Sequence, residues 1–206
     1  MNLALLSAFV PTFFFVSITP GMCMTLAMTL GMTIGVKRAL WMMLGELVGV
    51  ATVAILSAIG VAALLLNYPS IFMALKYIGG AYLAFVGLQM WLSKGKMAIK
   101  MDAVGSKPAS RLDLMSQGFV TAIANPKGWA FFVALLPPFL DASRPLASQL
   151  TVLIAIILTL EFICLLIYAT GGRTLKAILM QSGNVRIMNR IAGSLMIGVG
   201  VWLAIG

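Results

Sequence analysis

Three ionisable residues interrupt long apolar stretches of this sequence: Glu46, Lys127 and Glu161. A charged side chain is costly in the centre of a bilayer, so each needs a partner or a water-filled cavity. Lys127 could be the counter-charge for a solute carboxylate, or it could form a structural ion pair with a glutamate. Glu161 lies deep in its stretch and is a candidate proton-coupling group, because burial disfavours an ionised carboxylate. Glu46 is a second coupling candidate, or a side chain that reaches the polar interface.

Two short motifs place a capping residue, a proline and a glycine inside apolar stretches. They are Thr19-Pro20-Gly21 and Asn125-Pro126-Lys127-Gly128. Proline interrupts helical hydrogen bonding and disfavours helix at the preceding residue. Thr and Asn are good N-caps, and Pro suits the first helical position. Each motif therefore predicts one helix ending and another beginning. Two helix N-termini would suit a carboxylate; the alternative is two proline kinks patched by neighbouring hydroxyls.

The elements that position these residues are predicted to be transmembrane helices. The chain is 62% hydrophobic and 9% charged, with a mean hydropathy of +1.08, whereas soluble domains are about half apolar and a quarter charged. Its apolar stretches reach the roughly 20 residues needed to cross a bilayer. The predicted spans are 3–35, 39–66, 70–92, 114–136, 146–170 and 187–205. No basic residue precedes the first span, so we read it as retained rather than cleaved.

The basic residues orient these spans. If both termini lie on the periplasmic side, 11 of the 14 Lys and Arg face the cytoplasm and two face the other side, as the positive-inside rule requires. A basic cytoplasmic linker, 93–113, separates three spans in 1–92 from three in 114–206. Halves with an odd number of spans can repeat only in inverted form. We predict an all-α integral membrane protein of two inverted three-helix repeats, with helices 1 and 4 broken near the membrane midplane.

Three stretches of the chain resemble the LysE/RhtB family of amino-acid exporters. They are Thr19-Pro20-Gly21, LKYIGGAYLAFVGLQMWL at 75–92 and NPKGWAFFVALLPPF at 125–139. The resemblance covers the chain end to end. It implies a bacterial inner-membrane transporter, not an enzyme, that exports amino acids or related small zwitterions and is driven by a proton or other ion gradient. The chain departs from the family's common Pro-Gly-Pro at the first break, where Met22 follows Gly21.

We therefore predict a solute site at the two breaks and a coupling group nearby. The solute-binding candidates are Thr19, Pro20, Gly21, Asn125, Pro126 and Lys127, and the coupling candidates are Glu161 and Glu46. The expected partners are a small solute and membrane lipids, without nucleic acid, metal or cofactor. The GxxxG spacings Gly31/Gly35 and Gly45/Gly49 favour helix packing within one protomer, with a homodimer seam as the alternative.

Two other functions share parts of this pattern. A divalent-metal exporter would need several hard oxygen ligands, but the chain has no His and only two acidic residues inside its predicted spans. A thiol–disulfide electron carrier would need a cysteine beside both breaks, and only Cys23 lies beside one, since Cys164 is in the fifth span. No Walker-type nucleotide motif is present, so an ion gradient is the expected energy source.

Overall fold

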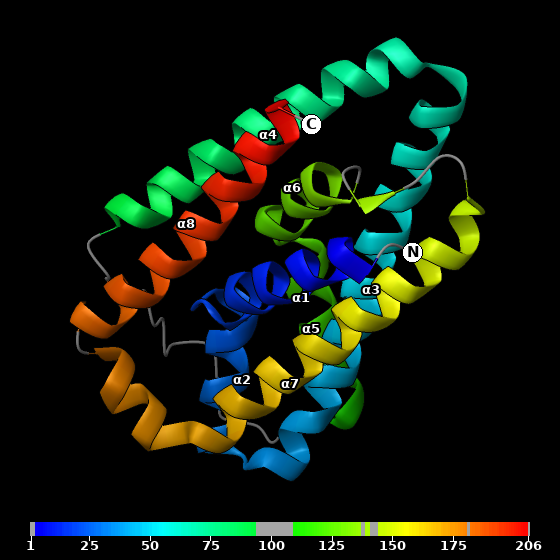
Figure 1. The fold of residues 1–206 in the computed structure, drawn as a ribbon. Coiled ribbons are helices and arrows are strands. Elements are labelled where there is room, and N and C mark those ends of the chain that lie inside the picture. The colour runs from blue at the N-terminus through cyan, green and yellow to red at the C-terminus, as the bar shows by residue number, and fades with distance from the viewer. Residues whose placement is uncertain (1–2, 94–108, 137–138, 141–143, 181, 206) are drawn as a thin grey trace.

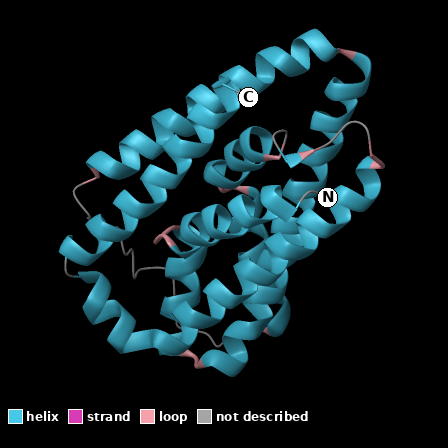
Figure 2. Ribbon diagram, in the orientation of Figure 1, coloured by secondary structure: helices cyan, strands magenta, loops and turns pink. Residues whose placement is uncertain are grey.

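The computed structural model describes residues 3–93, 109–136, 139–140, 144–180 and 182–205, and this part of the chain forms eight helices and no strand. In chain order these are α1 (Leu3–Ile18), α2 (Met22–Thr33), α3 (Val36–Asn67), α4 (Pro69–Leu92), α5 (Arg111–Ile123), α6 (Pro126–Leu135), α7 (Leu146–Met180) and α8 (Ser182–Ile205). Short connections separate most of them (Figure 2). Most of the predicted linker 93–113 lies outside the described residues.

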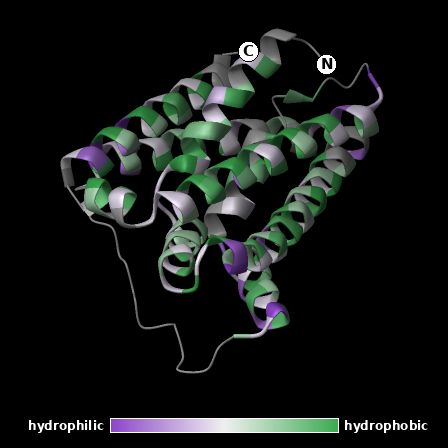
Figure 3. Cartoon of the chain, turned by 90° about the horizontal axis from the view of Figure 1, so that it is seen from below, coloured by the Kyte–Doolittle hydropathy of each residue, from purple (hydrophilic) through white to green (hydrophobic). Residues whose placement is uncertain are grey.

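The helices coincide with the apolar stretches of the sequence. By length and composition, α3 and α7 each contain a segment able to cross a membrane, Val36–Val61 and Leu146–Gly172. The pair α1 and α2 makes a third if it counts as one bent span. Most residues of the helices are apolar or of intermediate hydropathy, and the most hydrophilic residues lie mainly near helix ends (Figure 3). This distribution is that of a membrane protein, whose lipid-facing surface is as apolar as its core.

The first predicted break is present, but its cap is not the predicted one. The α1 helix ends at Ile18 and α2 begins at Met22, with a bend of 56° between them. We predicted Thr19 as the N-cap; instead the N-cap is Gly21, which makes no side-chain cap, and the Thr19 hydroxyl donates to the carbonyl of Phe15 at 2.6 Å. Thr19 therefore completes the end of α1, because its hydroxyl satisfies a carbonyl of the last turn.

The second break follows the predicted pattern. The α5 helix ends at Ile123 and α6 begins at Pro126, so Asn125 occupies the position before the first helical residue. The amide of Gly128 donates to the Asn125 carbonyl at 3.1 Å, which closes the first turn of α6. A proline at the first position loses no hydrogen bond there, because that N–H has no partner inside a helix.

Two glycines with positive φ change the direction of the chain, Gly35 between α2 and α3 and Gly172 within α7. Gly35 has a φ of 81° and lies between α2 and α3. The predicted packing role of the Gly31/Gly35 pair therefore holds only for Gly31, where a Cβ would collide with the Ala169 carbonyl of α7. Gly172 has a φ of 40° and a ψ of −120°, and it kinks α7 where its apolar segment ends. Side chains other than glycine are strained at such angles.

The predicted packing role of Gly45 and Gly49 is confirmed within the protomer. A Cβ on Gly45 would collide with the Met115 carbonyl of α5, and one on Gly118 would collide with the Met42 carbonyl of α3. The two backbones therefore touch at their glycines. Because a Cβ on Gly118 would also lie 2.8 Å from the backbone nitrogen of Glu46, this close crossing fixes where Glu46 leaves α3.

The broken helices occupy the middle of the molecule. The α4 and α8 helices lie side by side along one edge, while α1, α2 and α6 lie between this pair and α7 (Figure 1). Buried side chains form two clusters. One is rich in Phe and includes Phe13, Phe131 and Phe132, and the other contains Cys23, Met24 and Tyr168. Residues of both clusters meet at a cavity beside the two breaks.

Candidate functional site

A pocket lies where the two helix breaks meet. It is lined from the first break by Thr19, Gly21 and Met22, from the second by Asn125 and Gly128, and from other helices by Glu46, Glu161 and apolar side chains. The space open to the centres of water-sized molecules is about 90 Å³. A single water needs roughly 10–15 Å³ by this measure, so the pocket has room for several waters or a small solute.

Two glutamates from different halves of the chain face this pocket. Glu46 of α3 is 0% exposed, and neither of its carboxylate oxygens has a hydrogen-bond partner in the described part of the chain. Glu161 of α7 is its electrostatic neighbour. Glu161 Oε2 accepts a 2.5 Å hydrogen bond from the hydroxyl of Ser17 near the end of α1. The two acids differ, since Ser17 holds Glu161, whereas the Cys23 thiol and Glu161 itself are the polar neighbours of Glu46.

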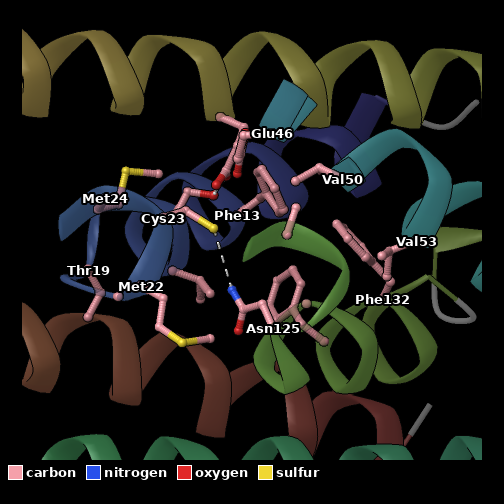
Figure 4. Close-up of a pocket in the computed structure, with 17 residues that line it drawn as sticks. Phe13, Thr19, Met22, Cys23, Met24, Glu46, Val50, Val53, Asn125 and Phe132 are labelled. Atoms are coloured by element: carbon pink, nitrogen blue, oxygen red, sulfur yellow. Dashed lines mark hydrogen bonds between the residues drawn. The ribbon is translucent and has the colours of Figure 1, made fainter. Parts of the chain in front are cut away.

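A thiol and an amide link the two breaks directly. The Asn125 amide nitrogen donates to Cys23 Sγ at 3.9 Å (dashed in Figure 4). Cys23 is the second residue of α2, and it lies beside Glu46 in the pocket wall (Figure 4). Both Cys23 and Cys164 are buried free thiols. The start of α2 is thus connected to the start of α6 by one side-chain contact.

Helix N-termini supply the positive side of the site. The first backbone N–H groups of α2 and α6 have no partner within their own helices, and Gly21 provides no side chain to cap those of α2. No basic residue is among the lining side chains that the structure describes. The Lys127 side chain lies outside the described residues, although its backbone belongs to the first turn of α6. The described polar groups of the pocket are therefore two carboxyl groups and the starts of two helices.

The far end of the pocket is apolar. Val53 of α3 and Phe132 of α6 lie together there, away from Glu46 and Cys23, and Val50 lies between them and Glu46 (Figure 4). Phe13 and Phe131 belong to the same aromatic wall, with ring centroids 5.6 Å apart. A solute in this pocket would meet polar groups at one end and aromatic or branched side chains at the other.

The structure brings most of the predicted site residues together. Thr19, Gly21 and Asn125 line one pocket with both predicted coupling residues. Pro20 lies between two of these residues, and Pro126 starts α6, but its side chain, like that of Lys127, is outside the described part.

Sequence reasoning missed Ser17 and gave no contact for Cys23 in this site. A hydroxyl or thiol within two or three residues of a predicted break is a signal that could have found both. It also gave no reason to place Glu46 beside Glu161. That proximity comes from the packing of α3 against α7, which no local pattern reports.

Comparison with known proteins gives consistent matches. A family model described as LysE type translocator matches residues 14–206. A homoserine/homoserine lactone efflux protein of Salmonella typhimurium is 27% identical over 197 residues, covering 96% of this chain and 94% of that protein. A leucine efflux protein of Enterobacter sp. is 26% identical over 194 residues, covering 93% and 90%. An uncharacterized membrane protein of Vibrio cholerae is 28% identical over 188 residues, covering 91% and 90%. No solved structure matches the chain at a significant level.

Proposed function

Because this chain belongs to the family of LysE type translocators, we propose that it is a secondary active exporter of amino acids or related small zwitterionic metabolites, coupled to the proton gradient. Members of this family are transporters and not enzymes. Similarity to proteins named for homoserine, homoserine lactone and leucine efflux supports an amino-acid-like solute.

The observation that carries the proposal is the pair of buried carboxyl groups in the central pocket. Glu46 is 0% exposed, and its polar neighbours are Glu161, another acid, and the Cys23 thiol. Two carboxylates close together in a low-dielectric interior repel strongly unless a proton or a cation is shared between them. A solute ammonium group and a proton are both suitable. If they use the same pair in turn, solute leaves as protons enter.

The remaining polarity of the pocket fits the other end of a zwitterion. In the proposed pose the ammonium group approaches Glu46 and Glu161, and the carboxylate approaches the N–H groups at the starts of α2 and α6. Helix N-termini bind anions through these N–H groups and the helix dipole. Lys127, in the first turn of α6, is proposed to add a positive charge on this side. The solute side chain then points to the apolar wall that includes Val53 and Phe132.

The proposed membrane arrangement has six spans in two inverted repeats. The broken pairs α1–α2 and α5–α6 would be the first and fourth spans, followed in each half by two long helices. Contacts between helices are consistent with this arrangement, because α7 packs on α1 and α2 as α3 packs on α5 and α6, and α4 packs on α8. Breaks in opposed repeats are a known way to build a solute site inside a bilayer. Both termini would lie on the periplasmic side.

Flux into and out of proteoliposomes tests the proposal. Purified protein should exchange a labelled amino acid from a panel of neutral and charged ones, and a pH gradient should drive its accumulation. A double variant, Glu46→Gln with Glu161→Gln, is the matched control because it keeps side-chain volume and removes both titrating groups. Failure of every amino acid to exchange, with correctly folded protein, would reject the proposed solute class. Exchange without any effect of the pH gradient would reject proton coupling alone.

A further inference from the structure

At each helix break, the helix before the break ends in a residue whose backbone carbonyl has no partner within that helix. In both cases this carbonyl accepts a hydrogen bond from an aromatic side chain. The Tyr168 hydroxyl donates to the carbonyl of Ile18, the last residue of α1, at 2.7 Å. The Trp129 indole nitrogen donates to the carbonyl of Ile123, the last residue of α5, at 2.9 Å. The last four carbonyls of any helix lack partners within it. Inside a membrane protein, water is not generally available to satisfy them.

Tyr168 ties the first break to α7. It is 1% exposed and lies seven residues, two helical turns, after Glu161, so both side chains face the same neighbour. Adjacent α1 residues bind them: Ser17 donates to Glu161, and Ile18 accepts from Tyr168. The end of α1 is therefore fixed by two hydrogen bonds to one face of α7.

Trp129 ties the second break together from within. It belongs to α6, yet its indole reaches back across the break to the end of α5. Asn125 lies inside the segment that this hydrogen bond spans, and its amide contacts Cys23 at the start of α2. The position of Asn125 in the second break therefore affects the position of Cys23 in the first one, through their side-chain contact.

We propose that Tyr168 and Trp129 are positioning residues that lock the two helix breaks and thereby hold the walls of the central pocket in place. The Tyr168 hydroxyl and the Trp129 indole N–H each satisfy a carbonyl that would otherwise seek another donor. Without the donor, the broken segment can rotate its carbonyl toward the pocket or shift to an alternative turn. Either movement displaces Cys23 or Asn125. The consequence for solute binding rests on the proposed function, but the locking of the breaks does not.

The reactivity of the Cys23 thiol can be used to measure whether both breaks keep their geometry. It is buried in the pocket wall, and it contacts Asn125 of the other break. In a Cys164→Ser background, its alkylation by N-ethylmaleimide reports how often the pocket wall opens. Tyr168→Phe removes only the hydroxyl, and benzothienylalanine at position 129 keeps the bicyclic ring but lacks the N–H. Each change should raise the Cys23 alkylation rate about tenfold, the size expected for losing a hydrogen bond to a buried carbonyl.

Tyr82→Phe is the matched control, because Tyr82 is 41% exposed on α4 and is not among the pocket-lining residues. It should leave the Cys23 alkylation rate unchanged. Melting temperatures of all variants in detergent separate local opening from general instability. Unchanged alkylation in both the Tyr168 and the Trp129 variants would overturn the proposal. The same holds for rates that rise only in proportion to the loss of global stability.

A transport measurement supplies a second readout. Positioning residues should alter the apparent KM of solute exchange about tenfold, whereas simple loss of folded protein lowers the maximal rate and leaves KM unchanged. If the parent protein exchanges solute and Tyr168→Phe has the parent KM, the link from the lock to the solute site is wrong. If the parent exchanges no amino acid, the proposed function fails, and the alkylation rates still decide whether the breaks are locked.

Discussion

The hydroxyl of Ser17 donates a 2.5 Å hydrogen bond to Oε2 of Glu161, joining residues that are 144 positions apart in the chain. The bond connects the end of a broken helix to a glutamate of the central pocket. A change in the charge of Glu161 alters the strength of this bond, since bonds to ionised acceptors are about twice as strong as neutral ones. Protonation of Glu161 would therefore weaken the hydrogen bond that holds the end of α1 at the α1–α2 break.

Glu161→Gln should uncouple export from the pH gradient. Glutamine keeps the volume and can still accept from Ser17, but it cannot exchange a proton. We expect accumulation driven by a pH gradient to be lost, while solute exchange at equal pH continues, because exchange needs no net proton movement. Paired measurements of both activities in proteoliposomes check this. Concentration of solute at the parent rate would transfer the coupling role to Glu46 or to another ion.

Low pH should weaken solute binding if protons and the solute ammonium group compete for the two carboxyl groups. The apparent KM for solute, measured on the cytoplasmic side, should rise as the pH on that side falls. The direction follows because a protonated carboxyl no longer attracts an ammonium group. Glu46→Gln should flatten the dependence. A KM that is independent of pH in the parent would argue against competition at this pair.

Lys127→Met should weaken export of solutes that carry a carboxylate. The substitution keeps an unbranched apolar stem and removes the charge near the start of α6. Loss of a hydrogen bond to a charged group corresponds to roughly a tenfold or greater increase in KM. Amino-acid amides, which lack the carboxylate, provide the control and should be affected much less. Equal effects on acids and amides would contradict the assigned role.

Gly45→Ala should destabilise the protein, whereas Gly60→Ala in the same helix should not. A Cβ at position 45 would collide with the Met115 carbonyl, but one at position 60 meets nothing within 4 Å. Overpacking of this kind costs typically 1–3 kcal/mol, while alanine is intrinsically favoured over glycine in helices by about 1 kcal/mol. Thermal unfolding in detergent compares the two. Similar melting temperatures would show that α3 and α5 can separate at little cost.

The orientation of α3 can be tested at its two exposed ends. In a background without Cys23 and Cys164, cysteine at Asn67 should react with an impermeant reagent added to intact cells, and cysteine at Lys37 should react only after lysis. Both positions are exposed, so accessibility differs only through the side of the membrane. Labelling of the Lys37 variant in intact cells would reverse the proposed topology.

The sequence alone determined where helices form and where two of them break. Apolar stretches and the prolines Pro20 and Pro126 act through local physics, because a proline disrupts the hydrogen bonding of its own turn in any context. Most helix boundaries accordingly lie close to the predicted spans, and α6 begins at Pro126 as expected. The exception is the expected loop after residue 170, where α7 continues to Met180 and α8 begins at Ser182. Even locally, however, competition among polar groups decided details: the Thr19 hydroxyl binds the Phe15 carbonyl, so the cap of α2 falls to Gly21.

Only the tertiary structure decided which of these residues share a site. Glu46 and Glu161 lie on different helices, and their proximity requires α3 to pack against α7. The hydrogen bonds that Tyr168 and Trp129 donate to the carbonyls at the two breaks could not be predicted from the sequence either. An aromatic residue in an apolar helix looks the same in the sequence whether or not its polar group donates a hydrogen bond. Local propensity depends on neighbours within a turn, whereas these contacts join atoms whose separation is set by the whole fold.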